Sequence, residues 1–381
     1  MSDFSQLVPE HVRRLGGYTP GKSPRQAQQE SGVTCIKLAS NETPFGPSPH
    51  AVRAMQAVLQ ECNFYPDNDA RELRDRLAER HGVEPEHVVV TAGSTALLGI
   101  IARTVLAPGL NAVTSKLSFI VYPIATKAAG GELIEVPTKH DGFDLDAVRA
   151  AINSNTRIVF LANPNNPTGT LIPAKELDRF LDQVPEHVIT VLDEAYYDFA
   201  QYFASQRGVD YSHWLEYLRQ ERGVVVLRTF SKAHGLAGLR IGYGLGPVEL
   251  MSHFSRMRTT FSISAVAQCG ALAALEDQAH TTRALENNAR EAPRLLEGLS
   301  DLGYGPVPTW TNFVYCEIGV EADAIAKRMQ AEGVIIRPLG PWGAPTAIRV
   351  TIGTPEQNQT FLKAFRKVME NVPVREKVTL R

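Results

Sequence analysis

The chain has 381 residues, of which 44% are hydrophobic and 21% charged, and its formal net charge is −2. This length and composition predict a globular protein with a large core and room for more than one domain. The balanced charge gives no reason to expect nucleic acid or a membrane surface as a partner, and no apolar run is long enough to span a bilayer.

Short apolar runs alternate with segments of helical period from about residue 50 to residue 260. Helices are expected over 50–60, 70–82 and 95–107, and strands over 87–92, 111–115, 157–162, 188–194, 224–229 and 239–245. Alternation of this kind indicates crossover units, which place parallel strands side by side and helices on both faces. The sequence therefore predicts an α/β fold with a mostly parallel sheet.

The pattern changes after residue 260. A long helical stretch is expected over roughly 264–302, followed by three strand-like segments, NFVYCEI, VIIRP and AIRVTI, and by a final helix from about residue 355. A further helix is expected near 321–332. We therefore expect a large domain over 41–275, and a smaller α+β domain made of 1–40 and 276–381.

Four of the expected strands lead directly into polar residues. These are Gly93, Ser94 and Thr95, then NPNNPTG (163–169), then Asp193 and Glu194, and then Ser231 and Lys232. In open α/β sheets, ligands bind in the crevice outside the carboxyl ends of the strands, so these groups are expected to meet there. Each has a simpler explanation as a helix cap, a rigid turn or a solvated side chain. Their convergence favours a cofactor site.

The order of three motifs resembles that of the pyridoxal-phosphate aminotransferases with the aspartate-aminotransferase fold. The motifs are NPNNPTG, DEAY (193–196) and SKAHGLAGLR (231–240), and the resemblance covers nearly the whole chain. It implies that Lys232 forms a Schiff base with pyridoxal 5'-phosphate and later acts as the general base. It also implies that Asp193 lies against the pyridine nitrogen and that Tyr196 belongs to the catalytic groups.

The same resemblance implies further contacts with the cofactor. Asn166 and Tyr196 match the donors to the phenolic oxygen of the ring, and Phe119 matches the aromatic side chain that stacks on it. The phosphate contacts implied are the amides of Gly93, Ser94 and Thr95, the hydroxyls of Thr229 and Ser231, and the guanidinium of Arg240. The small residues of AHGLAG allow the tight turn that returns Arg240 to the vicinity of Lys232.

Within this family the chain is most similar to the histidinol-phosphate aminotransferases. The similar segments are 15–23, 36–49, 65–67, 312–315, 334–338 and 348–354. The resemblance implies amino transfer from histidinol phosphate to 2-oxoglutarate, in histidine biosynthesis, by a homodimer with shared active sites. The implied substrate contacts are Tyr18, Asn41, Arg337 and Arg349, and Tyr65 is expected to reach the site of the neighbouring subunit.

Two positions differ from the pattern of these relatives. Ala96 stands where they usually carry a glutamate, and Phe119 replaces their more common tyrosine. Neither change removes a catalytic group. An aromatic amino-acid transaminase on the same scaffold therefore stays open as an alternative.

Two other classes of protein compete with an aminotransferase. GGYTPGKS (16–23) matches the pattern of an ATP-binding P-loop, but such a loop needs a strand before it and a helix after it, and the flanking residues predict neither. A binding protein without activity has no need of Lys232 and Asp193.

Cysteine and histidine usage bears on the compartment and on metals. The cysteines, Cys35, Cys62, Cys269 and Cys316, are far apart and form no CxxC pair, which suits a reducing compartment. The histidines show no metal-binding spacing, so no metal is expected. The polar N-terminal segment does not resemble a signal peptide, and a cytoplasmic protein is expected.

Overall fold

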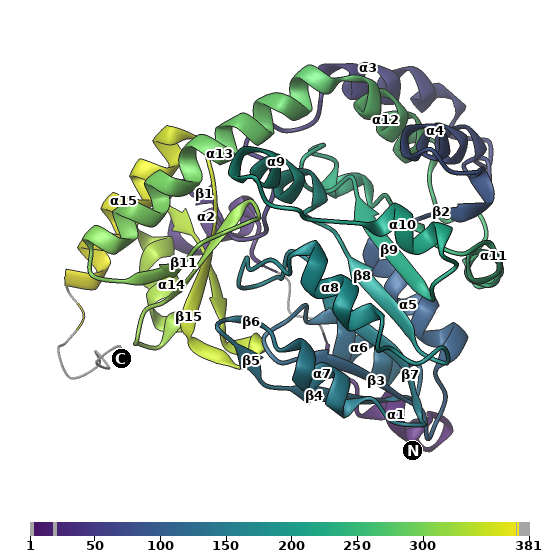
Figure 1. The fold of residues 1–381 in the computed structure, drawn as a ribbon. Coiled ribbons are helices and arrows are strands. Elements are labelled where there is room, and N and C mark those ends of the chain that lie inside the picture. The colour runs from purple at the N-terminus through teal and green to yellow at the C-terminus, as the bar shows by residue number, and fades with distance from the viewer. Residues whose placement is uncertain (1–3, 18–20, 371, 373–381) are drawn as a thin grey trace.

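The computed structural model describes residues 4–17, 21–370 and 372. Figure 1 shows a large region, in which a sheet lies between helices, and a smaller region built from the C-terminal part of the chain. The long helix α13 (Gln278–Asp301) runs from the large region to the smaller one. The expected α/β fold class is confirmed.

The described part of the large region contains a seven-stranded sheet in the order β2-β10-β9-β8-β7-β3-β4. The strands are β2 (Val88–Thr91), β3 (Asn111–Ser115), β4 (Glu132–Val136), β7 (Thr156–Ala162), β8 (Ile189–Asp193), β9 (Val224–Thr229) and β10 (Gly242–Leu245). Only β10 runs antiparallel to its neighbours, so the sheet is mostly parallel as predicted. The sequence did not indicate β4, an edge strand that carries exposed Glu132 and Glu135.

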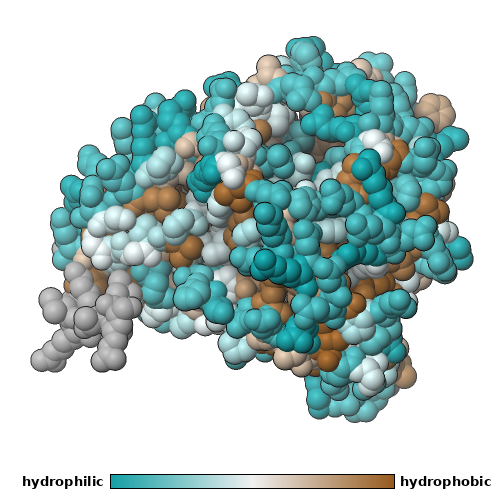
Figure 2. Space-filling model, viewed as in Figure 1, coloured by the Kyte–Doolittle hydropathy of each residue, from teal (hydrophilic) through white to brown (hydrophobic). Residues whose placement is uncertain are grey.

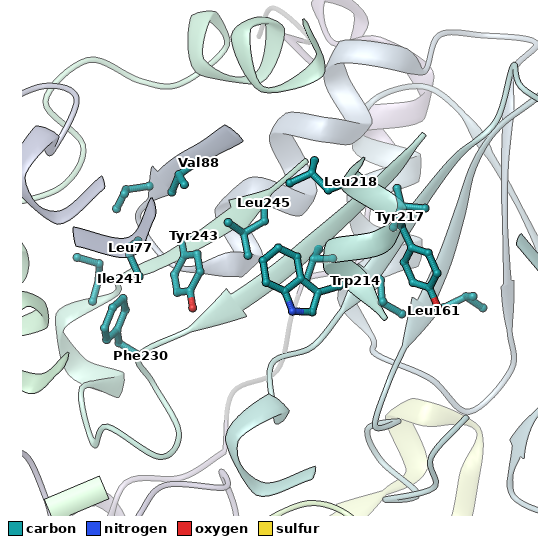
Figure 3. Packing of buried hydrophobic residues seen from close by; sticks show 14 of the residues in the cluster. Leu77, Val88, Leu161, Trp214, Tyr217, Leu218, Phe230, Ile241, Tyr243 and Leu245 are labelled. Atoms are coloured by element: carbon teal, nitrogen blue, oxygen red, sulfur yellow. The ribbon is translucent and has the colours of Figure 1, made fainter. Parts of the chain in front are cut away.

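Helices cover both faces of this sheet. They are α3 (Pro49–Val58), α4 (Arg71–His81), α5 (Ser94–Val105), α6 (Val121–Ala128), α7 (Leu145–Ala151), α8 (Ala174–Leu181), α9 (Tyr197–Arg207), α10 (Trp214–Arg219), α11 (Val248–Arg256) and α12 (Ala265–Glu276). Strands β2 and β9 are buried along their whole length, which explains why they read as continuous apolar runs rather than alternating ones. Figure 3 shows the packing on one side, where Leu77 and Trp214 from helices meet strand residues such as Leu161 and Leu245.

The smaller region has its own core. Its described part contains a four-stranded antiparallel sheet, β11-β12-β15-β14. The strands and helices are β11 (Gly305–Val307), β12 (Phe313–Glu317), β14 (Arg337–Leu339), β15 (Ala344–Thr351), α2 (Pro24–Ser31), α14 (Ala322–Ala331) and α15 (Pro355–Glu370). Strand β1 (Ile36–Lys37) pairs with β13 (Val334–Ile335), which joins the N-terminal part of the chain to this region. The precise residue limits of the two domains stay a prediction.

The helical stretch expected over roughly 264–302 forms two consecutive helices, α12 and α13. Asp277 ends α12 and begins α13, because its side chain accepts a hydrogen bond from the backbone N–H of His280 at 3.1 Å. Aspartate competes for backbone donors in this way and therefore favours helix starts. The same carboxylate also accepts from the hydroxyl of Ser48 at 2.7 Å, a contact distant in sequence that fixes the break.

The P-loop alternative lacks the strand that it needs. In the described residues before 16–23, the chain forms a short 3₁₀ helix, η1 (Phe4–Leu7), and a helical turn, α1 (Glu10–Arg13). Ser23 then caps α2. Residues 18–20 of this stretch lie outside the described residues. No strand leads into the loop from the residues described, although helix α2 does follow it, which the sequence did not predict.

The remaining elements are short. They are the hairpin β5 (Thr138–Lys139) and β6 (Gly142–Phe143), and the 3₁₀ helices η2 (Leu59–Glu61), η3 (Pro85–His87), η4 (Ala237–Leu239) and η5 (Gly340–Trp342). On the face seen in Figure 2, hydrophilic residues predominate and hydrophobic ones lie in small separate areas. Among the helices of the described residues, none combines the length and the apolar character needed to cross a bilayer.

Candidate active site

A cavity of about 250 Å³ lies where the carboxyl ends of β7, β8 and β9 face the smaller region. It is lined by most of the residues that the sequence singled out: Asn41, Ser94, Thr95, Phe119, Asn166, Asp193, Tyr196, Thr229, Ser231, Lys232, Arg240, Arg337 and Arg349. The strand ends therefore meet as expected from the α/β pattern. Side chains from the smaller region complete the wall.

Lys232 follows β9, and its amine lies buried near the positive charge of Arg349. Its Nζ donates a hydrogen bond to the carbonyl of Ser40 at 3.2 Å. Burial, together with the positive charge of Arg349, lowers the pKa of Lys232 to about 7. A large share of the amine is therefore neutral near pH 7, which is the form that attacks a carbonyl carbon.

Asp193 ends β8 and is only 4% exposed. Burial raises the pKa of its carboxyl to about 6, although the hydroxyl of Tyr122 and the N–H of Ala195 both donate to it. The two donors lie 3.1 and 3.2 Å from the carboxylate oxygens. A carboxylate whose charge is so poorly compensated suits a ligand that brings a cationic N–H to it.

Tyr122 is a site residue that sequence reasoning missed. It lies on α6, is fully buried, and packs edge-on against Phe119 with ring centroids 5.7 Å apart. The sequence did indicate that Tyr122 lies near Phe119. Tyr122 comes three residues after Phe119 where a helix begins, and residues at this spacing share a face. Only the packing of α6 against the sheet brings its hydroxyl to Asp193.

Asn166 and Arg349 determine each other's orientation. The guanidinium of Arg349 donates to Oδ1 of Asn166 at 2.5 Å and to the carbonyl of Ala39 at 2.9 Å. Arginine has only donors, so the amide oxygen of Asn166 must face it and the NH₂ group must point elsewhere. Asn41 similarly donates from Nδ2 to the hydroxyl oxygen of Tyr196 at 2.8 Å.

The start of α5 and the turn after β9 form a cradle for an anion. Helix α5 begins at Ser94 without a side-chain cap, and its N-terminal amides favour negative charge. Arg240 has a left-handed backbone with φ 52°, and its guanidinium donates to the hydroxyl of Ser231 at 3.3 Å. Ser231 in turn accepts from Thr229 at 2.9 Å.

Gly93 has a structural role in this cradle. Its own N–H donates to the carbonyl of Thr91 at 2.7 Å and is therefore already used within the chain. A Cβ atom at Gly93 would lie 2.6 Å from Arg240, so glycine is required for the guanidinium to approach. Ser94 and Thr95 line the cavity directly.

Arg337 and Arg349 lie directly opposite each other on the neighbouring strands β14 and β15. Both are buried, with exposed fractions of 7% and 5%. Like charges in such a cross-strand pair are destabilising by roughly 0.2–1 kcal/mol. Both side chains also line the cavity and bring two positive charges to it.

Of the expected site residues that the structure describes, Tyr65 and Gly93 do not line the cavity. Tyr65 is 82% exposed and stacks on Phe261, with ring centroids 4.7 Å apart. Tyr18 lies outside the described residues. Tyr65 is therefore not part of the cavity of its own chain.

The fold and the site define an enzyme class: an amine of lowered pKa, a buried carboxylate and an anion cradle meet at the strand ends of an open α/β sheet. Such a site suits a phosphorylated cofactor that reacts with amines. The family model for class I and II aminotransferases matches residues 33–365. The chain belongs to the class I and II aminotransferase family.

Two curated relatives have names more specific than that of the family. Histidinol-phosphate aminotransferase 2 of Pseudomonas fluorescens Pf-5 is 43% identical over 96% of this chain and 98% of its own length. Histidinol-phosphate aminotransferase 1 of Thiobacillus denitrificans is 41% identical over 97% of this chain and 95% of its own. These relatives are similar to the chain along almost its entire length.

Solved structures agree with the sequence comparison. The histidinol-phosphate aminotransferase of Sinorhizobium meliloti, in complex with pyridoxal-5'-phosphate, has a TM-score of 0.87 and 30% identity, covering 96% of this chain and 98% of that one. The aspartate aminotransferase of Thermus thermophilus with maleate has a TM-score of 0.80 and 25% identity, covering 95% and 99%. The fold is therefore that of the aspartate aminotransferases, as the sequence motifs implied.

Proposed function

We propose that the protein uses pyridoxal phosphate to transfer the amino group of histidinol phosphate to 2-oxoglutarate. The names of the curated relatives support this substrate. The observation that carries it is the opposed pair of Arg337 and Arg349 in the same cavity as Lys232. Two guanidiniums suit a phosphate dianion, whereas a single carboxylate usually needs one bidentate arginine.

The residues present fit the proposed cofactor. The uncompensated carboxylate of Asp193 suits a protonated pyridine nitrogen, and the uncapped start of α5 with Arg240 suits a phosphate. Pyridoxal phosphate, when bound, reacts with a primary amine and withdraws electrons from the carbon that bears it. Lys232 is the candidate to hold it covalently.

The other side chains take roles that follow from their contacts. Lys232, whose pKa is already near 7, can accept and return a proton at the substrate's α-carbon. Asp193 would hold a proton on the pyridine nitrogen, and Tyr122 and Ala195 hold that carboxylate in place. The NH₂ group of Asn166, turned away from Arg349, is available as a donor to the cofactor ring.

Replacing Arg337 by alanine tests the proposed substrate. Losing one charge-assisted contact with phosphate is expected to cost about 1.5–3 kcal/mol, or roughly ten- to a hundredfold in kcat/KM for histidinol phosphate. The value for phenylalanine should change little. Steady-state kinetics with both donors measure the difference, and Arg366→Ala, an exposed arginine on α15, is the matched control.

The same experiment decides between the two candidate substrates. An aromatic amino acid carries a carboxylate and no phosphate, so an aromatic transaminase would use only part of the arginine pair. If the wild-type enzyme prefers phenylalanine and Arg337→Ala leaves both donors unaffected, the protein is an aromatic amino-acid transaminase on this scaffold.

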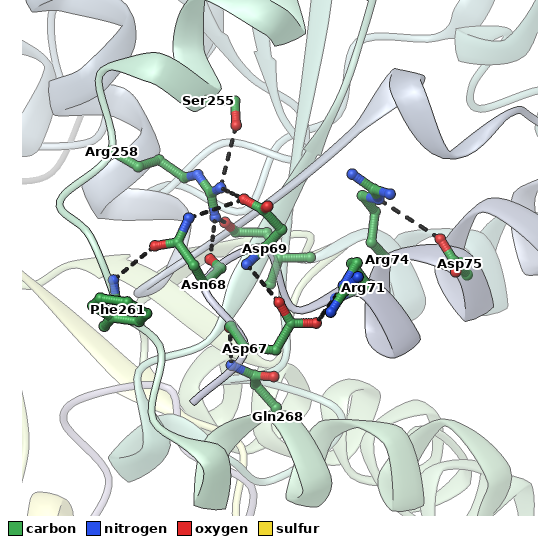
Figure 4. A network of polar contacts seen from close by, with 11 residues as sticks. Asp67, Asn68, Asp69, Arg71, Arg74, Asp75, Ser255, Arg258, Phe261 and Gln268 are labelled. Atoms are coloured by element: carbon green, nitrogen blue, oxygen red, sulfur yellow. Dashed lines mark hydrogen bonds and ion pairs between the residues drawn. The ribbon is translucent and has the colours of Figure 1, made fainter. Parts of the chain in front are cut away.

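We also propose that the protein acts as a homodimer in which Tyr65 completes the partner's site. Tyr65 and its neighbour Phe64 are 82% and 70% exposed, and large exposed aromatic side chains that lie together are typical of interfaces. The loop after Tyr65 is held in place by polar contacts. Figure 4 shows Asn68 accepting from the N–H of Phe261 and Arg258 binding Asp69.

Mixing two inactive variants tests the shared site. Lys232→Ala removes the amine from a subunit's own site, and Tyr65→Ala removes the tyrosine that a subunit supplies to its partner's site. A hybrid dimer of the two variants therefore has one site in which both residues are intact. With random exchange, activity should return to about a quarter of the wild-type value. Subunit exchange is verified with a tagged chain, and exchange without recovery of activity would count against Tyr65 acting in the partner's site.

The state of the cysteines supports a cytoplasmic location, which we propose. All four lie in the described ranges, and all four are free thiols. Cys35 and Cys316 are buried, and Cys62 is exposed. An exposed free thiol is more compatible with a reducing compartment than with an oxidising one.

A further inference from the structure

Trp342 lies in the wall of the active-site cavity, a position that the sequence around it does not predict. It ends η5, the tight turn that connects β14 to β15, the two strands that carry Arg337 and Arg349. Gly343 follows with a left-handed backbone, φ 81°, and closes the turn. The indole thereby folds back to the cavity and forms part of its wall.

The indole ring contacts both arginines of the cross-strand pair. The Cζ atom of Arg337 lies 4.9 Å from the ring centroid, and that of Arg349 lies 5.8 Å from it. Both distances are within the range of cation–π attraction, which is strongest for tryptophan. One aromatic ring therefore attracts two guanidiniums that repel each other.

Trp342 also lines a second, smaller cavity of about 60 Å³. Both cavities are lined by Trp342 and Phe119, and the smaller one is also lined by Glu135. A smaller side chain in place of the indole would therefore leave more space beside the two guanidiniums.

We infer that Trp342 is a positioning residue for phosphate recognition, because its indole face holds the guanidinium of Arg337 beside that of Arg349, which Asn166 and Ala39 also anchor. This inference rests on the proposed function, in which the arginine pair binds the phosphate of the amino donor. Trp342 acts through the arginines. Its replacement should therefore weaken the binding of a phosphorylated donor specifically.

The test compares two donors that differ only in the phosphate, histidinol phosphate and histidinol. In Trp342→Leu, the ratio of their kcat/KM values should fall by about tenfold or more, through KM of the phosphorylated donor, while kcat stays within about twofold. Trp342→Phe keeps an aromatic face and should restore most of the ratio. Trp310→Leu is the matched control, because Trp310 lies outside the cavity and packs near Arg207.

The visible absorption of the bound cofactor should be the same in all variants, which separates positioning from a general loss of structure. An unchanged ratio in Trp342→Leu would overturn the inference. A loss in Trp342→Phe as large as that in Trp342→Leu would also overturn it, because the aromatic face would then not be what matters.

A wild-type enzyme that does not distinguish histidinol phosphate from histidinol would refute the proposed substrate, and a separate measurement then decides the role of Trp342. Inorganic phosphate is used as a competitive inhibitor of whichever donor is accepted. Weaker inhibition in Trp342→Leu, by about tenfold, with near wild-type inhibition in Trp342→Phe, supports the inference. Equal inhibition in all three proteins overturns it.

Discussion

Lys232→Ala is expected to abolish both amino transfer and covalent attachment of the cofactor. A general base alone contributes about 10²–10⁴ in rate, and the loss of a covalent nucleophile comes in addition, so kcat should fall by at least about four orders of magnitude. The purified wild-type protein should be yellow. The variant should bind the cofactor only non-covalently, through groups such as Arg240 that remain in the cavity.

Borohydride reduction identifies the lysine that holds the cofactor. In the wild-type protein the reduced cofactor should be found by peptide mass spectrometry on Lys232 alone. Lys175→Ala, an exposed lysine on α8, is the matched control and should label and react normally. Label on a different lysine would show that the central assignment is wrong.

Asp193→Asn is expected to give the second largest effect. The change keeps the shape of a fully buried side chain but removes the charge that pairs with a pyridine nitrogen. Breaking a buried ion pair typically costs about 3–5 kcal/mol. If that cost falls on the transition state, it corresponds to a loss of roughly two to four orders of magnitude in kcat. Tyr122→Phe removes only one donor to the carboxylate and should have a smaller effect.

An active Asp193→Asn enzyme would refute the role of Asp193 in drawing electrons from the substrate. The pH dependence of the thermal stability of the cofactor-free protein independently tests the raised pKa of Asp193. Burial raises the pKa of Asp193 from 3.8 to about 6, so the folded protein binds this proton more tightly than the unfolded one does. The resulting stability is present below the ordinary pKa and is lost as the pH rises through about 6. Above that pH, the cofactor-free variant should therefore melt at a higher temperature than the cofactor-free wild type.

The sequence by itself determined the class of fold and the composition of most of the site. Alternating apolar runs predict the parallel sheet, and a polar residue that follows such a run must lie at the carboxyl edge of that sheet. Lys232, Asp193 and Asn166 line one cavity for this reason, although they are far apart in the chain. The motif order was sufficient to indicate the family, because each motif occupies the end of a different strand.

Other features were decided only by tertiary structure. The register of β14 against β15 places Arg337 opposite Arg349, and no local pattern specifies that pairing. Tyr122 reaches Asp193 because α6 packs against the sheet, and Trp342 reaches both arginines because a tight turn folds it back. Periodicity along a chain reports which face of an element is apolar, but not which residue of a distant element will lie against it. Contacts of this kind depend on how whole elements pack, and their free energies are shared among many residues far apart in the sequence.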